Sequence, residues 1–210
     1  MATVTYYLQN AAPPYAPTTK RGAWDDAAST VAKGLGSQSG ANTFTETLIG
    51  NVTANWDQLL VRFVSAPLGS DCNFSGTIDG VIGLIGATAL NGYLHLHVFV
   101  LQGGDPSDTL RGTLWANYID SDPLSNTAAT GGEGFSGTMS DLIAYAGDTI
   151  VVEAGVRASA GATGDNSLLY YGASGSDLVD NQNCTVSPGW IRLAYTSLVG
   201  PFPTFIDLGA

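Results

Sequence analysis

The sequence predicts an all-β protein, a sandwich or a barrel, with roughly ten strands. Short segments in which apolar and polar residues alternate recur along the chain, whereas helical periodicity is nearly absent. Gly, Asn, Asp and Pro bound these segments, and the 210 residues include 27 glycines and 9 prolines. The expected strands are Thr3–Gln9, Asn42–Ile49, Gln58–Ser65, Phe74–Ile85, Tyr93–Gln102, Thr109–Tyr118, Gly134–Leu142, Asp148–Arg157, Ser167–Gly172 and Trp190–Thr196.

Two segments show the alternation most clearly. In Tyr93–Gln102, the leucines and valines at even positions share one face, and His95 and His97 lie on the other face. In Asp148–Arg157 the same period of two follows a Gly-Asp turn. Both faces of these strands carry apolar residues, so we expect both faces to be at least partly covered.

Other segments depart from simple strands. Gly76, Gly80 and Gly83 interrupt Phe74–Ile85 and Gly86 follows it, which predicts bulges or a bent strand that passes between sheets. Residues Trp24–Lys33 are expected to form one short helix, capped by an Asp and ended by the glycines that follow it. Small and polar residues predict long exposed loops over Ser121–Gly137 and Ala158–Asn166.

Composition limits the class of protein. With 44% hydrophobic and 12% charged residues the chain should fold, and it contains no continuous apolar stretch of the roughly 20 residues that a membrane-spanning helix needs. The formal net charge of −11 makes nucleic acid and anionic membranes poor partners. Met1–Tyr7 lacks the basic region and apolar core of a secretion signal. We therefore expect neither nucleic acid nor a membrane as a partner.

The two ends differ in composition from the middle of the chain. We expect an N-terminal strand and Pro-rich arm over residues 1–20, a single β-sandwich domain over 21–196 and an apolar arm over 197–210. An apolar arm needs a surface to cover it, either on its own domain or on a neighbouring copy. The candidate interface residues are Phe202, Phe205, Ile206, Leu208, Pro13 and Pro14.

Cysteines and arginines have structural interpretations. Cys72 and Cys184 are expected to be two buried reduced thiols, with one disulfide as the alternative. Few cations are present, so the arginines in or next to expected strands should pair with Asp or Glu at sheet edges or interfaces. These arginines are Arg62, Arg111, Arg157 and Arg192.

The pair His95 and His97 is the most site-like feature. Residues i and i+2 of a strand point the same way, so the two imidazoles are weak candidates for a shared metal. A cupin metal site is similar, but its glutamate and third histidine have no counterpart here. The alternative is a pair of solvent-facing or interface histidines. We expect no metal and no cofactor.

No catalytic arrangement emerges from the sequence. A Gly-x-Ser-x-Gly elbow is absent, and the many carboxylates form no recognisable pair, so the protein is expected not to be an enzyme and to have no catalytic residues. The oxygen-rich loop Asp120–Asn126 is either a calcium ligand or, as we favour, a hydrophilic turn. Four Trp and nine Tyr offer stacking surfaces for a glycan.

Several stretches resemble small structural proteins of tailed bacteriophages. They are residues 7–13, Arg21–Asp26, Trp56–Ser65, Leu110–Leu114 and Ala146–Glu153. The resemblance implies a head-decoration or minor-tail protein of the virion with a jelly-roll-like antiparallel β-sandwich and several copies.

This resemblance implies a function based on assembly contacts. The expected partners are the protein itself, as a homo-oligomer with a trimer favoured, and other virion proteins. The expected location is the exterior surface of the virion, after synthesis in the host cytoplasm. The alternative function is that of a carbohydrate-binding β-sandwich for adhesion, with a surface glycan as the partner.

Overall fold

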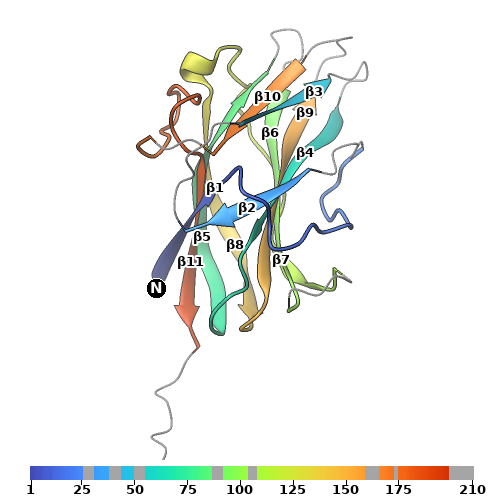
Figure 1. Cartoon of the computed structure of the whole chain (residues 1–210), viewed down its shortest axis with the longest axis vertical. Helices are drawn as coiled ribbons and strands as arrows, with labels where there is room; N and C mark the ends of the chain where they lie inside the picture. The colour runs from blue at the N-terminus through green and yellow to red at the C-terminus, as the bar shows by residue number, and fades with distance from the viewer. Residues whose placement is uncertain are drawn as a thin grey trace, which may run out of the picture.

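A computed structural model describes residues 1–25, 31–37, 44–49, 55–86, 92–103, 108–158, 166–172 and 175–198. These residues form eleven strands and one 3-10 turn, η1 (Ala128–Thr130) (Figure 1). The strands are β1 (Ala2–Leu8), β2 (Ala32–Gly36), β3 (Phe44–Ile49), β4 (Trp56–Ser65), β5 (Cys72–Ile85), β6 (Gly92–Leu101), β7 (Leu110–Ile119), β8 (Gly132–Ala144), β9 (Thr149–Ala158), β10 (Asn166–Tyr171) and β11 (Trp190–Ser197). In the described residues, no helix has the length and apolar character needed to cross a membrane.

The strands form one continuous sheet that folds over on itself. Its order is β3-β10-β5-β11-β1-β2-β4-β9-β6-β7, and β8 pairs with the other edge of β5. All pairs are antiparallel except β2 and β4, which run parallel. Trp115 of β7 lies against Gly137 of β8, but no ladder joins these two edges among the described residues. The all-β, sandwich-like fold expected from the sequence is therefore confirmed.

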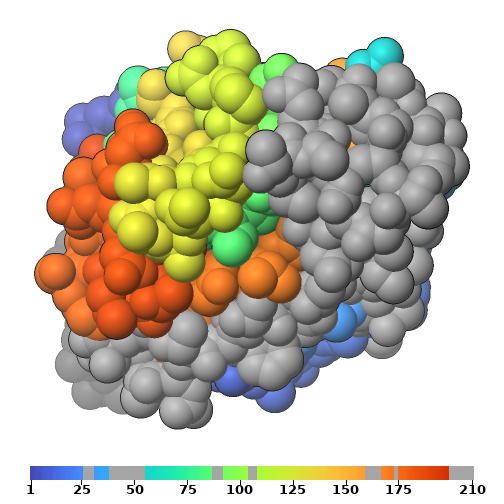
Figure 2. Space-filling model, turned by 90° about the horizontal axis from the view of Figure 1, so that it is seen from above, coloured from blue at the N-terminus to red at the C-terminus, as the bar shows by residue number. Residues whose placement is uncertain are grey.

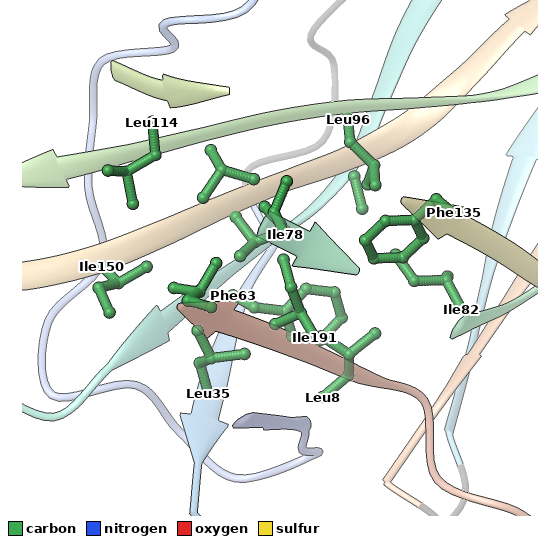
Figure 3. Packing of buried hydrophobic residues seen from close by; sticks show 14 of the residues in the cluster. Leu8, Leu35, Phe63, Ile78, Ile82, Leu96, Leu114, Phe135, Ile150 and Ile191 are labelled. Atoms are coloured by element: carbon green, nitrogen blue, oxygen red, sulfur yellow. The ribbon is translucent and has the colours of Figure 1, made fainter. Parts of the chain in front are cut away.

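The core lies between the two halves of this sheet. Side chains from nine different strands and from both halves point toward one another (Figure 3). They are Leu8, Leu35, Phe63, Ile78, Ile82, Leu96, Leu114, Phe135, Ile150 and Ile191, and each is 5% exposed or less. Burial of this apolar area is the main term that stabilises the fold.

The central strands β6 and β9 are buried on both faces, as the sequence predicted. The even positions of β6 enter the core, and His95, His97 and Phe99 lie on the outer face. The outer face is buried because chain from the N-terminal region covers it. This cover positions the polar cluster described below.

The glycines of β5 act as expected. Its ladder with β8 shifts register between Phe74 and Gly76, and Gly76 has φ +85°. Along its other edge the strand pairs with β11 from Cys72 to Val81 and then with β10 from Gly83 to Ile85. Gly80 admits no side chain, because a Cβ there would lie 2.4 Å from the carbonyl oxygen of Trp190.

Two sequence predictions fail in the described residues. The helix expected over Trp24–Lys33 is wrong: Trp24 and Asp25 are irregular, and β2 begins at Ala32, while residues 26–30 lie outside the described residues. The glycines expected to stop a helix lie in β2, and a Cβ at Gly36 would clash with the side chain of Gln9. The loop expected over Ser121–Gly137 ends earlier, because β8 begins at Gly132. The loop expected over Ala158–Asn166 falls mostly on residues outside the description.

One end of the sandwich is covered by two segments that lie side by side. Figure 2 shows residues near 121–131 in contact with the segment near 175–189. Backbone hydrogen bonds join them, from Cys184 to Ala128 and from Asn181 to Gly132. A small apolar cluster of Val81, Leu178 and Cys184 lies beneath this cover.

Candidate functional site

The two histidines lie on one face of β6, as predicted, but they are buried. His95 is 0% exposed and His97 is 4% exposed, so the expectation of solvent-facing or interface histidines is wrong. The chain from Tyr15 to Asp25, here called the strap, crosses the outer face of β4, β9 and β6 above them. The local sequence of β6 does not predict that the strap covers this face.

His95 belongs to a network of buried charge. Its Nδ1 lies 2.9 Å from Oδ1 of Asp57, and the indole of Trp24 covers its ring at a centroid distance of 4.2 Å. Arg157 binds both oxygens of Asp57 from the neighbouring strand. Burial lowers the pKa of His95 even though Asp57 opposes the shift. The imidazole is therefore neutral at pH 7 and donates to Asp57 through Nδ1–H.

Glu153 is the most deeply buried carboxylate in this cluster. It is 0% exposed, and its Oε2 accepts hydrogen bonds from the N–H of Gly22 at 2.7 Å and from Nε1 of Trp24 at 2.8 Å. The N–H of Arg21 donates to Oε1 at 3.1 Å. Successive backbone N–H groups of this kind form an anion-binding nest. Gly22 is required there, because a Cβ would lie 2.4 Å from Nε1 of Trp24 and 3.1 Å from Cβ of His97.

Further polar contacts fix the rest of the strap. The carboxylate of Asp108, 1% exposed, accepts from the N–H and the hydroxyl of Thr18 and from the N–H of Thr19. Arg62 donates to the carbonyl of Pro17. Buried carboxylates and one guanidinium therefore hold the strap along its length. A substrate reaches His95 or Glu153 only if the strap leaves the sheet.

The arginine prediction is largely confirmed. Arg111 pairs with Asp148, Arg157 with Asp57 and Arg192 with Asp79. Arg62 differs, because its guanidinium donates to the backbone carbonyl of Pro17 in the strap. Both cysteines are buried and free, as expected.

A groove on the outer surface is a second candidate site. It has a volume of about 460 Å³ and lies where β5, β8 and β11 meet the segment after residue 175. Its lining combines three aromatic side chains, apolar side chains and two carboxylates. The residues are Tyr118, Phe135, Trp190, Val81, Leu178, Val179, Asp79 and Asp180. Such a surface offers apolar faces for a ring and acceptors for hydroxyl groups.

The carboxyl group of Glu133 lies beside this groove. Burial, together with the nearby carboxylates of Asp120, Asp180 and Asp122, raises its pKa to about 7, against one stabilising hydrogen bond from the N–H of Ser125. The negative potential here disfavours anionic ligands.

A small pocket opens at the end of the sandwich where β1 begins and β11 ends. Its volume is about 150 Å³, and its lining residues are Val4, Tyr6, Leu68, Gly69, Ser70, Cys72, Phe74 and Tyr195. Burial raises the pKa of Cys72 to about 11, so its thiol is neutral at pH 7 and a poor nucleophile.

Exposed apolar side chains gather at the same end, which we call the exit end. Met1 is 80% exposed, and Ile143, Tyr145 and Leu198 are each exposed by nearly half. Strand pairing brings them together, since Cys72 pairs with both Ala144 and Ser197. Adjacent strands are about 4.8 Å apart, so these side chains belong to one surface.

The structure tests the sequence-predicted site residues unevenly. His95 and His97 are together, and the described residues contain no group of three or more His, Cys, Asp or Glu side chains suited to a metal. Pro13 is half-buried and Pro14 is exposed, just before the strap. Phe202, Phe205, Ile206 and Leu208 lie outside the described residues.

Sequence reasoning missed the residues that organise the buried cluster. Asp57, Glu153 and Trp24 were not singled out as a site. One signal was available, because Glu153 lies among apolar residues of a strand expected to be covered on both faces. A carboxylate there must find donors, and Trp24 supplies one of them.

Comparison with solved structures finds similar folds. No family model matches the sequence, and no curated protein matches it. An aminopeptidase from the marine sediment archaeon Thaumarchaeota archaeon is similar with a TM-score of 0.52 and 7% identity, over 94% of this chain and 37% of that one. A CocE/NonD family hydrolase from Staphylococcus aureus has a TM-score of 0.48 and 10% identity, over 93% and 37%. An α-amino acid ester hydrolase has a TM-score of 0.47 and 11% identity, over 92% and 36%.

This comparison corrects one expectation. The sequence predicted that the protein is not an enzyme, and this prediction is contradicted because the solved structure that shares the fold with a TM-score of 0.52 is an aminopeptidase. The chain spans little more than a third of the length of these solved structures. At this identity the likeness shows the fold, and it transfers no activity and no catalytic residue to this chain.

The buried carboxylate gives a first prediction. Glu153→Gln replaces one acceptor oxygen by an N–H₂ donor that faces the N–H groups of the strap. We expect the free energy of unfolding in urea to fall by about 2–3 kcal/mol and Trp24 to become more exposed, shifting the fluorescence to the red. Asp141→Asn at an exposed position should stay within about 0.5 kcal/mol of the wild type. Equal stability of both variants would contradict the role given to Glu153.

A second prediction concerns pH. The folded pKa of Glu133 is about 7 and its ordinary value is 4.5, so the folded state binds more protons in between. Its contribution to stability is therefore present below pH 4.5 and is lost as the pH rises through 7. Relative to wild type, Glu133→Gln should gain on the order of 2 kcal/mol of unfolding free energy from pH 4.5 to 7.5.

The comparison with wild type is needed because the histidines act in the opposite sense. Burial lowers the pKa of His95 and of His97, so their contribution is lost as the pH falls below 6.5. The histidines are present in both the wild type and Glu133→Gln, so their effect cancels in the difference between the two free energies of unfolding. A difference that does not change with pH would show that Glu133 is not perturbed.

Proposed function

We propose that the protein is a structural component of a tailed-phage virion that acts through contacts between copies and with other virion proteins. The observation that carries the proposal is the exit end. Apolar side chains stay exposed there, next to the point where the chain continues into an apolar segment with two phenylalanines. Contiguous apolar surface of this kind is typical of protein–protein interfaces.

Other features agree with an assembly role. A groove of about 520 Å³ lies at the exit end and is lined by Asn73, Arg111, Asp141, Leu142, Ile143 and Tyr145. Arg111 lies over the ring of Tyr145 at 4.6 Å, and aromatic and arginine side chains are enriched in interfaces. A closed oligomer, with a trimer favoured, would cover one such surface per copy. The acidic surface suits the exterior of the virion, away from packaged DNA.

Solution mass tests this proposal. Light scattering should give a defined oligomer for the full chain and a monomer after deletion of residues 199–210. Ile143→Ser should also raise the dissociation constant at least tenfold, because it removes an apolar contact. Val186→Ser is the matched control: Val186 is 60% exposed and belongs to the segment that covers the other end.

The outcome of that measurement is decisive. A monomer at all concentrations for the full chain, or an oligomer that Val186→Ser and Ile143→Ser weaken equally, would overturn assembly through the exit end.

The groove of Tyr118 and Trp190 supports a second candidate function, the binding of a neutral glycan. Asp180 lies at its edge, and its Oδ1 already accepts a hydrogen bond from the N–H of Gly134 at 2.9 Å, which fixes the carboxylate. Asp79 is held by Arg192 in a similar way. Oriented carboxylates accept from sugar hydroxyls, and their charge disfavours acidic sugars.

Matched sugars test this candidate. Saturation-transfer NMR should detect the methyl pyranosides of glucose, galactose or mannose but not glucuronic or galacturonic acid, which differ by a carboxylate. Asp180→Ala should weaken the signal about tenfold, since a hydrogen bond to a charged group contributes about 1.5–3 kcal/mol. Asp141→Ala, outside the groove, should not. Signals from the acidic sugars, or from no sugar, would contradict the assignment.

A further inference from the structure

We infer that the pocket at the exit end binds the phenyl ring of Phe202 from a neighbouring copy of the chain. This inference rests on the proposed assembly function and gives it a specific contact. It assigns the pocket to a donor segment, the C-terminal residues 199–210, and the interaction to the burial of one aromatic side chain.

The size and chemistry of the pocket fit such a ring. Its volume is about 150 Å³, and an apolar cavity of roughly 150 Å³ in a protein is known to hold a benzene molecule. Val4, Leu68 and Phe74 provide apolar contacts, and Phe74 is itself only 1% exposed. The rings of Tyr6 and Tyr195 complete the lining. Aromatic rings pack favourably against one another in such sites.

The pocket lies beside the point where the C-terminal segment leaves the domain. The N–H of Leu198 donates to the carbonyl of Asp71, the residue before Cys72 in the pocket wall. The twelve residues that follow include four large apolar side chains, Phe202, Phe205, Ile206 and Leu208. A segment of this composition requires a surface to cover it. The exit end supplies both the segment and a surface in every copy.

The sequence around Phe202 favours exchange between copies. Pro201 and Pro203 flank it, and a residue that precedes proline is restricted to extended backbone. The four residues from Leu198 to Phe202 span at most about 14 Å when extended, which limits the exchange to directly adjoining copies. The two prolines also reduce the entropy lost on binding. Phe202 is therefore the anchor of the segment.

Reciprocal exchange closes the assembly. Each copy donates one segment and offers one pocket, so a ring of copies leaves neither unpaired. This geometry accounts for a pocket with aromatic and aliphatic lining residues that is open at the surface in an isolated copy.

A disulfide trap tests the contact. Phe202→Cys in a Cys184→Ala background places a thiol within reach of Cys72, and a disulfide forms only when the Cα atoms approach within about 7 Å. Oxidation with copper-phenanthroline should give covalent dimers and larger rings on a non-reducing gel, and reduction should return them to monomers. The matched control Thr204→Cys, two residues along, should cross-link far less. Adding Cys72→Ser should abolish the product.

A variant that blocks the pocket tests the same contact without the disulfide cross-link. Nothing lies within 4 Å of a Cβ built at Gly69, so Gly69→Trp is accommodated and places a large side chain at the mouth of the pocket. We expect Gly69→Trp and Phe202→Ala to raise the dissociation constant of the oligomer at least tenfold with an unchanged melting temperature of the monomer. Gly103 also has open space around it, but its φ of +55° would strain a tryptophan, so the control is placed elsewhere. Ser136→Trp, at an exposed position in the other groove, should leave assembly unchanged.

The outcomes separate the inference from the proposed function. A monomeric wild type would overturn assembly itself. An oligomer that persists in Gly69→Trp and Phe202→Ala, or a disulfide that joins Cys72 and position 202 within one chain, would leave assembly standing and overturn the exchange of Phe202.

Discussion

The burial of the Glu153 carboxylate is the constraint on which the outer layer of this protein depends. A fully buried charge is tolerated only when several donors stabilise it, and here the donors come from a segment about 130 residues earlier in the chain. The strap therefore cannot leave without breaking its hydrogen bonds to Glu153 and uncovering His95 and His97. What would otherwise be a surface of β4, β6 and β9 becomes an interior, and the sandwich gains a third, partial layer.

This arrangement divides the molecule into a covered face and accessible ends. The covered face, which we call the wall, is the outer face of β4, β6 and β9 beneath the strap. It holds the histidines, and the hydrogen bonds of the strap leave no route for a ligand. The groove of Tyr118 and Trp190 and the exit end are instead accessible, and they differ in character: one has fixed carboxylates, and the other has apolar side chains and a pocket. Recognition is therefore expected at surfaces built by loops and strand ends, which the rigid wall holds in position.

The sequence predicted the strands well because alternation is a local property. Ten of the eleven strands overlap expected segments, and β2 was missed because it has only five residues, two of them glycines, which is too little for an alternating pattern to show. The site was predicted only in part. That His95 and His97 share a face follows from the period of two, but their burial depends on Gly22 and Trp24, whose contacts with β6 and β9 are long-range. The sequence predicted that Arg157 pairs with an acidic residue, but it did not predict that this residue is Asp57.

The position of β1 has a consequence for how the protein is made. β1 lies between β2 and β11, and β11 in turn joins β1 to β5, so the middle of the sheet is built from the first and last strands of the described chain. During synthesis, β1 and β5 have unpaired edges until residue 197 has emerged from the ribosome, and such edges are prone to pair with other chains. Pairing across the middle of the sheet is thereby delayed until β11 has been synthesised. A prematurely terminated chain lacks the strand that joins the two parts, and it is excluded from any structure that requires the folded exit end.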